Sequence, residues 1–269
     1  IYKVTPSGAL PFYNLTQANN LGYNAFGQIL VDGGFMYIET SAGGANNLGT
    51  VLKIDIAAGT ATKLLDFSSV TGFTSYILNP TGNKDKVIIN GKLYINTAQG
   101  GANSLGTILE VDIVTGAHTV IYDLLNTPSS SSASTFSKGL AIEYNGDYVL
   151  VAHNRLLVYN TTTQTLTAQT LFTGAAAVND FHLLGSDLYV VYNSIARFLK
   201  IDLSTYTLLV NQRLDTLASS FFGANTYFST TCFYDSVLNR IVTKNYIDLK
   251  MISYDIATNT FVQETNHSG

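Results

Sequence analysis

Residues 33–67 read GGFMYIETSAGGANNLGTVLKIDIAAGTATKLLDF, and residues 90–124 read NGKLYINTAQGGANSLGTILEVDIVTGAHTVIYDL. Both stretches contain a Gly turn, a strand ending in Tyr-Ile-x-Thr, the letters Gly-Gly-Ala-Asn, and Leu-Gly-Thr at the start of an alternating strand that contains an Asp. Weaker copies begin at Asp147, Asp187 and Asn239. The chain is therefore built from a repeat.

The period of the repeat follows from the polar residue that closes its third strand. This residue is found at Asp55, Asp112, Asn160, Asp202 and Asp255, with a further equivalent at Thr5. The spacings between the five full copies run from 42 to 57 residues. A period of this size that contains only short strands is typical of a β-propeller, in which each repeat is a four-stranded blade. One blade cannot bury both of its faces, so neighbouring blades stack.

Glycine and asparagine mark the predicted turns within a blade. In the first blade the four strands are expected near residues 24–31, 35–40, 50–56 and 61–67. Gly33-Gly34 lies between the first and second of these strands, and Ala58-Gly59 lies between the third and fourth. Glycine tolerates the positive φ that two-residue hairpin turns require. The alternation over 51–56 predicts a strand packed against one neighbour. No stretch shows a helical period.

We expect one all-β domain over residues 1–269, a β-propeller of four-stranded blades. The five full blades are expected at about 23–67, 73–124, 138–172, 177–214 and 228–265. Residues 1–15 supply only the third and fourth strands of another blade, which favours a six-bladed ring. Its two inner strands would then come from further sequence or from a partner chain. The alternative is a ring of five blades with residues 1–15 as an extra edge.

Composition and charge exclude several classes of function. The chain is 46% apolar and only 12% charged, so it can bury a sizeable core and is not disordered. The net charge is −4 and no basic cluster occurs, which argues against a nucleic-acid partner. No apolar stretch is long enough to insert into a membrane. The lone Cys232 is expected to be a buried thiol, and no spacing of residues predicts a metal site or a cofactor.

Two blades resemble the GloVer-type repeat of secreted bacterial proteins. Residues 43–53 and 100–110 resemble its pattern Gly-Gly-x-Asn-x-x-Gly-Thr-Val-Phe-Lys, with Leu52 and Leu109 in place of the usual aromatic residue. The other three blades look like generic blades of the YncE-like kind. The resemblance implies a secreted or surface-anchored propeller of Bacteroidota-like bacteria, and it brings no catalytic residues. N-x-Ser/Thr sequons at Asn14, Asn160 and Asn266 matter only if the source organism glycosylates such sites.

The long connections of the chain are expected at one end of the blades. The connections between the second and third strands of a blade lie at the same end as the connections between blades. The long connections at this end are residues 41–49, 97–106, 126–138 and 215–227. Ligand sites concentrate on long loops held by a rigid scaffold. We therefore predict a binding face for protein or glycan that includes Asn46, Asn47, Asn103, Ser104, His153, Arg155, Tyr192, Arg197 and Tyr246. Wide turns and packing between blades would explain the same residues without a ligand.

The favoured function is a non-catalytic binding or scaffold propeller. One alternative is a hydrolase or lyase, in which Asp180 and His182 act as acid and base in a central channel. Another is a purely structural domain of an adhesin or appendage, whose half-blade is completed by partner strands.

Overall fold

A computed structural model of the chain describes residues 2–5, 8–11, 13–15, 20–73, 86–97, 99–123, 139–152, 154–173, 178–192, 196–214, 228–245 and 251–263. The chain divides into two compact units. The first unit consists of Ile1–Leu150 and Leu157–Thr167, and the second consists of Val151–Leu156 and Ala168–Gly269. None of the described residues form a helix long and apolar enough to cross a membrane.

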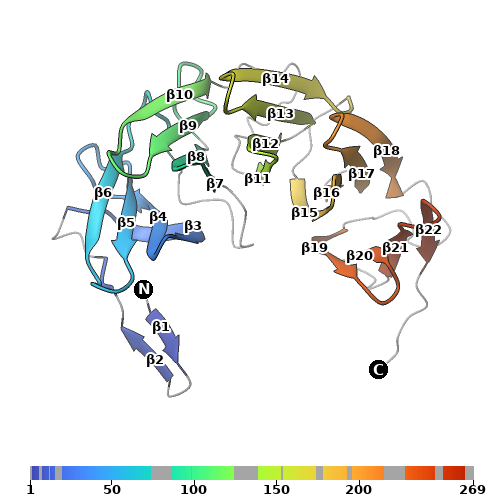
Figure 1. The fold of residues 1–269 in the computed structure, drawn as a ribbon, viewed down its shortest axis with the longest axis horizontal. Helices are drawn as coiled ribbons and strands as arrows, with labels where there is room; N and C mark the ends of the chain where they lie inside the picture. Colours follow the sequence, from blue (N-terminus) through green and yellow to red (C-terminus); the bar gives the residue numbers. More distant parts are fainter. Residues whose placement is uncertain are drawn as a thin grey trace. The chain divides into compact units, whose positions relative to one another are not determined.

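Five four-stranded sheets follow one another along the chain, with their strands in sequence order (Figure 1). The first contains β3 (Tyr23–Asp32), β4 (Phe35–Ala42), β5 (Thr50–Asp55) and β6 (Ala61–Asp66). The second contains β7 (Lys86–Ile89), β8 (Lys92–Asn96), β9 (Thr107–Asp112) and β10 (His118–Asp123). The third contains β11 (Leu140–Tyr144), β12 (Asp147–Ala152), β13 (Arg155–Asn160) and β14 (Thr165–Thr170). The fourth contains β15 (Val178–Leu184), β16 (Asp187–Tyr192), β17 (Arg197–Asp202) and β18 (Thr207–Arg213). The fifth contains β19 (Phe228–Asp235), β20 (Arg240–Asn245), β21 (Met251–Asp255) and β22 (Thr260–Gln263).

A sixth, two-stranded sheet precedes them. It pairs β1 (Tyr2–Thr5) with β2 (Gly8–Pro11) in antiparallel register, with Tyr2 opposite Pro11. The five four-stranded repeats and the strand pair at the amino terminus are therefore confirmed.

The turns are confirmed at two positions in the repeat. Gly33 and Gly34 both have positive φ, as do Asn90 and Gly91, which is the geometry of a two-residue hairpin turn. The turn between the third and fourth strands is longer, because β5 ends at Asp55 and β6 begins only at Ala61. These bounds agree to within one residue with the strands expected near 50–56 and 61–67, and Gly59 has the expected positive φ.

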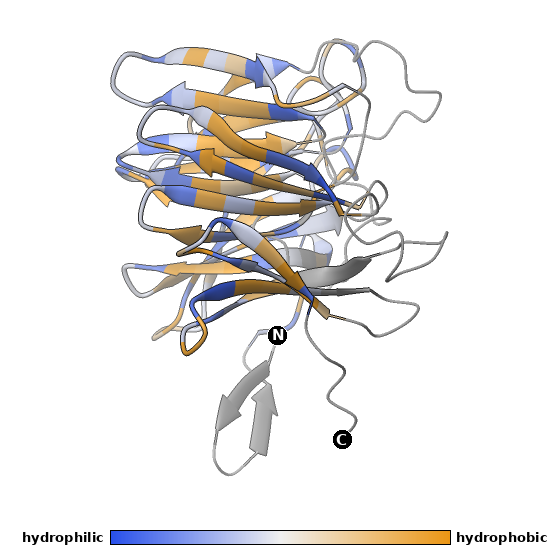
Figure 2. Ribbon diagram, turned by 90° about the vertical axis from the view of Figure 1, so that its right-hand side faces the viewer, coloured by the Kyte–Doolittle hydropathy of each residue, from blue (hydrophilic) through white to orange (hydrophobic). Residues whose placement is uncertain are grey.

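The second and third strands of each sheet carry most of the buried apolar residues. In β5, Val51 and Leu52 point to opposite faces and both are 0% exposed. The expectation that this strand packs against only one neighbour was therefore wrong: both faces are covered. The fourth strands are far more exposed, as in β14 and β18. Figure 2 shows hydrophobic residues in orange along the strands and hydrophilic residues in blue towards the turns.

Each unit has a core between neighbouring sheets. In the first unit, Tyr37 and Val51 of the first sheet pack with Leu93 and Leu109 of the second. In the second unit, a cluster that joins the fourth and fifth sheets contains Tyr189, Phe198, Cys232, Ile241 and Tyr254. Cys232 forms no disulfide within the described residues and is 7% exposed, so its predicted burial is confirmed.

A buried ion pair also joins the first two sheets. The Lys86 Nζ atom of β7 lies 2.9 Å from Oε1 of Glu39 in β4, and the two side chains are 0% and 1% exposed. Such charges are costly to bury unless they are paired, so each fixes the position of the other.

Candidate functional site

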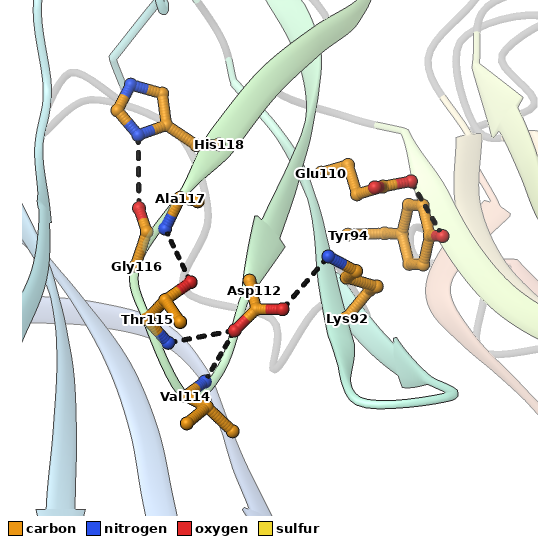
Figure 3. A network of polar contacts seen from close by, with 9 residues as sticks. All are labelled: Lys92, Tyr94, Glu110, Asp112, Val114, Thr115, Gly116, Ala117 and His118. Carbon is orange, nitrogen blue, oxygen red and sulfur yellow. Dashed lines mark hydrogen bonds and ion pairs between the residues drawn. The ribbon is translucent and has the colours of Figure 1, made fainter.

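The turn between the third and fourth strands is built on the residue that sets the repeat period. Asp55 Oδ1 accepts hydrogen bonds from the amides of Ala57 and Ala58, both at 2.8 Å. Asp112 Oδ1 does the same for Val114 at 3.0 Å and Thr115 at 2.8 Å (Figure 3). Equivalent bonds to the residues that follow are made by Asn160, Asp202 and Asp255. The period therefore has a physical cause: each repeat needs a side-chain acceptor to close this turn.

The polar groups at this end of the second sheet bind each other. Lys92 Nζ lies 3.0 Å from Asp112 Oδ2, and the Tyr94 hydroxyl donates to Glu110 Oε2 at 2.9 Å; dashed lines mark both contacts in Figure 3. The backbone amide of Thr115 and the Lys92 ammonium hold the pKa of the Asp112 carboxyl well below its usual range. Hydrogen bonds at the turn likewise lower the pKa of Asp202 and Asp255. These groups stabilise turns rather than offering a ligand site.

At the opposite end of the strands, the Gly-Gly-Ala-Asn loops are held by an aspartate at the end of the fourth strand. The Ala45 amide donates to Asp66 Oδ1 at 2.7 Å, and the Ala102 amide donates to Asp123 Oδ2 at 2.6 Å. A Cβ atom on Gly44 would lie 2.5 Å from Asp66 Oδ1. The second glycine of the motif thus leaves room for the carboxylate.

Buried threonines tie each loop to the segment before its sheet. The Thr40 and Thr50 hydroxyls are 3.0 Å apart, as are those of Thr97 and Thr107. Thr50 also donates to the Leu21 carbonyl, and Thr107 to the Thr71 carbonyl. The Tyr-Ile-x-Thr and Leu-Gly-Thr parts of the repeat therefore meet in one hydrogen-bonded junction.

The four predicted binding residues on these loops lie close to this framework. Asn46 Nδ2 donates to the Phe67 carbonyl at 2.8 Å, and Asn47 Oδ1 accepts from the Gly43 amide at 3.2 Å. Asn47 and Ser104 occupy equivalent positions with φ of 54° and 55°. Asn46, Asn47, Asn103 and Ser104 are all exposed. At least two of these side chains thus shape the loop, and ligand binding by the four stays a prediction.

A second group of side chains gathers at the same end of the fourth sheet. The Arg197 guanidinium lies over the Phe172 ring, 4.7 Å from its centroid, and Nη1 hydrogen-bonds Asn211 Oδ1. Asn211 Nδ2 donates to the Leu171 carbonyl at 3.2 Å. The Tyr192 ring meets Phe172 edge-on at 5.1 Å between centroids. We call Phe172, Tyr192, Arg197 and Asn211 the Arg197 cluster.

Members of the Arg197 cluster differ in exposure. Asn211 is exposed and Arg197 is half-buried, whereas Tyr192 is 0% exposed. Burial raises the pKa of the Tyr192 hydroxyl, which has no hydrogen-bond partner within the described residues. Arg197 and Asn211 therefore keep exposed surface, while the buried Tyr192 ring packs against Phe172, on which Arg197 is stacked. Phe172 and Asn211 are members that the sequence analysis missed.

The other predicted residues are placed as follows. Arg155 begins β13 and is half-buried. Its neighbour Asn154, also missed, donates from Nδ2 to the Phe172 carbonyl at 2.9 Å, as Asn46 does to Phe67. His153 and Tyr246 lie outside the described residues, as do the long connections 126–138 and 215–227.

Asp180 and His182 lie on β15, on the face towards the fifth sheet. Asp180 Oδ2 accepts a hydrogen bond from the Cys232 amide at 2.9 Å, and Oδ1 accepts from the Phe181 amide at 2.9 Å. The His182 ring is 5.6 Å from the Tyr234 ring. These contacts join β15 to β19, which is a structural role. Catalysis by this pair stays a prediction. No group of three or more metal-ligating side chains occurs in the described part of the chain.

Comparison with known proteins shows the fold. No family model and no curated protein matches the chain. Among solved structures, the extracellular domain of the putative one-component system BT4673 from B. thetaiotaomicron matches with a TM-score of 0.54 and 12% identity, over 82% of this chain and 26% of that one. Virginiamycin B lyase from Staphylococcus aureus matches with a TM-score of 0.54 and 13% identity, over 93% of this chain and 72% of the lyase chain. BamB from Moraxella catarrhalis matches with a TM-score of 0.54 and 12% identity, over 89% of this chain and 61% of the BamB chain. The chain spans about a quarter of the BT4673 domain.

Proposed function

We propose that this chain, a β-propeller by its four-stranded sheets and its structural neighbours, is a non-catalytic binding propeller. It holds a protein or glycan partner at the end of its blades where the Arg197 cluster lies. One observation carries the proposal: the Arg197 guanidinium is stacked on Phe172 and oriented by Asn211 at a partly open position.

The chemistry of the cluster suits recognition. A guanidinium that is already stacked and hydrogen-bonded loses little conformational freedom when a partner binds. Arginine and aromatic residues dominate the binding energy of protein interfaces. Arginine and asparagine side chains also provide the hydrogen bonds that sugar hydroxyls or carboxylates require.

The cellular setting is part of the same proposal. The chain acts outside the cell, in a secreted or surface protein, which is supported by its likeness to the extracellular domain of BT4673. We assign the two Gly-Gly-Ala-Asn blades to the GloVer type, which is supported by the loop contacts that they share. The other three blades are assigned to the YncE-like type by their resemblance in sequence alone. The whole chain acts as one propeller domain.

The test is a binding screen with paired variants. Purified wild-type protein is applied to a glycan array and used to capture extracellular proteins, and each hit is repeated with Arg197→Ala and Arg240→Ala. Arg240 is the matched control because it pairs with Asp255 at 3.3 Å in the fifth sheet, near its tight turns. We expect binding to be lost with Arg197→Ala and kept with Arg240→Ala. Hits that both variants retain, or no hits at all, would overturn the proposal.

A second variant separates binding from folding. Tyr192→Phe removes a buried hydroxyl that has no partner within the described residues, so stability is expected to stay equal or rise. Binding should be retained, because the ring still supports Phe172. Loss of binding by a stable Tyr192→Phe protein would show that the hydroxyl itself contacts the partner.

A further inference from the structure

Two apolar side chains on the first strand of the first sheet are exposed. Ile29 is 51% exposed and Val31 is 64% exposed. Val31 lies opposite Met36 across the β3–β4 pair, whereas Leu30 lies opposite Tyr37. Cross-strand partners share a face, and Leu30 and Tyr37 pack in the core with the second sheet. Val31, and Ile29 two residues before it, therefore lie on the face turned away from the second sheet.

The same face of the first sheet is already covered where it is formed by β4 and β5. Its buried residues are Ile38, Leu52 and Ile54, against which Tyr13, Leu15, Leu21 and Met36 pack. Val31 lies opposite Met36, and Met36 lies opposite Ile54. The exposed apolar surface on β3 is thus continuous with an existing packed interface.

The segment after β2 repeats a pattern seen between the other sheets. Phe67, which follows β6, packs in the core with the second sheet, and Leu214, which follows β18, packs in the core with the fifth. Tyr13 and Leu15 follow β2 and pack on the first sheet in the same way. By this pattern β1 and β2 correspond to the third and fourth strands of a sheet. Within the described residues, β1 pairs only with β2, which leaves its other edge for a second strand.

Exposure of this kind is specific to the ends of the series of sheets. Among the described residues, exposed large apolar side chains on a first strand occur only at Ile29 and Val31 of β3 and at Phe233 of β19. The first strands of the second, third and fourth sheets contribute buried residues instead, among them Ile89, Leu140, Ile142 and Phe181.

We propose that the β3 face containing Ile29 and Val31 is a docking site for a two-stranded β-hairpin of a partner polypeptide. One strand of the hairpin pairs with the free edge of β1, so that the two strands and β1–β2 form a sixth four-stranded sheet. The hairpin presents apolar side chains at alternate positions to Ile29 and Val31, because a strand exposes alternate residues to one face. Backbone hydrogen bonds supply affinity, and the apolar contacts fix the register. This proposal does not depend on the Arg197 cluster.

The test uses hairpins that the chain itself places as first and second strands. Synthetic peptides with the sequences of residues 86–96 and 139–152, each extended by lysines for solubility, are titrated against the protein. Binding is measured by calorimetry, and hydrogen exchange reports protection of the β1 amides. The variants are Val31→Asp and Val31→Lys, with Leu209→Asp as the control, because Leu209 is 52% exposed on the fourth strand β18.

We expect saturable binding of at least one peptide, slower exchange in β1, and binding at least tenfold weaker in both Val31 variants but unchanged in Leu209→Asp. Equal binding by all variants would show that the peptides attach elsewhere and would overturn the proposal. So would the absence of binding by both peptides. Sedimentation of the protein as a dimer that Val31→Asp dissociates would assign the face to a second copy instead.

Discussion

The Asp66 carboxylate, at the end of β6, accepts a hydrogen bond from the amide of Ala45 in the first Gly-Gly-Ala-Asn loop at 2.7 Å. Asp123 and Ala102 repeat this relationship in the second sheet at 2.6 Å. The loop is therefore fixed from the end of the fourth strand, and its conformation depends on a residue 21 positions away in both copies.

Replacing this acceptor should loosen the loop. Asp66→Ala leaves the Ala45 amide without its acceptor, and we expect a loss of about 1–3 kcal/mol in the free energy of unfolding, measured by urea denaturation. Asp66 also pairs with Lys63 at 2.7 Å. Lys63→Ala is therefore the control, and its expected cost is at most about 1 kcal/mol because both side chains are partly exposed. Equal losses in the two variants would assign the effect to the ion pair.

The glycine that closes the loop should tolerate no side chain. Gly49 has φ of +93°, and a Cβ atom there would overlap the Thr40 carbonyl oxygen. Gly59 has φ of +66°, and a Cβ atom there would meet nothing within 4 Å, so Gly59→Ala isolates the backbone strain. We expect a cost of roughly 1 kcal/mol for Gly59→Ala and about 3 kcal/mol or more for Gly49→Ala in thermal unfolding. Similar costs would mean that the close approach to Thr40 is easily relieved.

The buried pair of Glu39 and Lys86 should be sensitive to loss of one partner. Glu39→Gln or Lys86→Met leaves a single charge at a site with almost no exposure, and the expected cost is about 3–5 kcal/mol. The double variant Glu39→Met with Lys86→Met removes both charges and should regain most of that loss. A double variant as unstable as the sum of the single variants would contradict this account.

The turn aspartates make stability depend on pH at the acid end. The pKa of Asp112 is depressed in the folded protein, so its stabilising contribution is complete above its ordinary pKa of 3.8 and is lost as the pH falls from there through the folded value. Asp112→Asn keeps an acceptor for the turn but loses the pairing with Lys92. The melting temperature of the wild type should therefore fall more steeply below about pH 4 than that of Asp112→Asn. A difference between the two proteins that stays constant with pH would contradict this assignment.

The sequence was sufficient to predict the sheets, because turn chemistry and repeat period are local. Gly33-Gly34 and Asn90-Gly91 require φ values that few other residues adopt, so they locate the hairpins directly. The Asp55 and Asp112 positions set the period because each closes a turn with its own side chain.

The sites depend on contacts between distant residues, and there the sequence was less informative. Asp66 and Asp123 occupy matching positions in the two aligned repeats, a signal that was available and was missed. The stacking of Arg197 on Phe172 has no such signal, because it joins the segment after β14 to the start of β17 and no local pattern marks a contact between them. Tyr192 was predicted for the binding face, but its ring is wholly buried because it packs edge-on against Phe172.

We propose above that this propeller binds its partner at the Arg197 cluster. The most direct test is the dissociation constant of one partner from the binding screen, measured by calorimetry for the wild type, Arg197→Ala and Arg240→Ala. We expect at least a tenfold weaker affinity for Arg197→Ala, with Arg240→Ala unchanged and all three proteins folded. Equal affinities for the wild type and Arg197→Ala would contradict it.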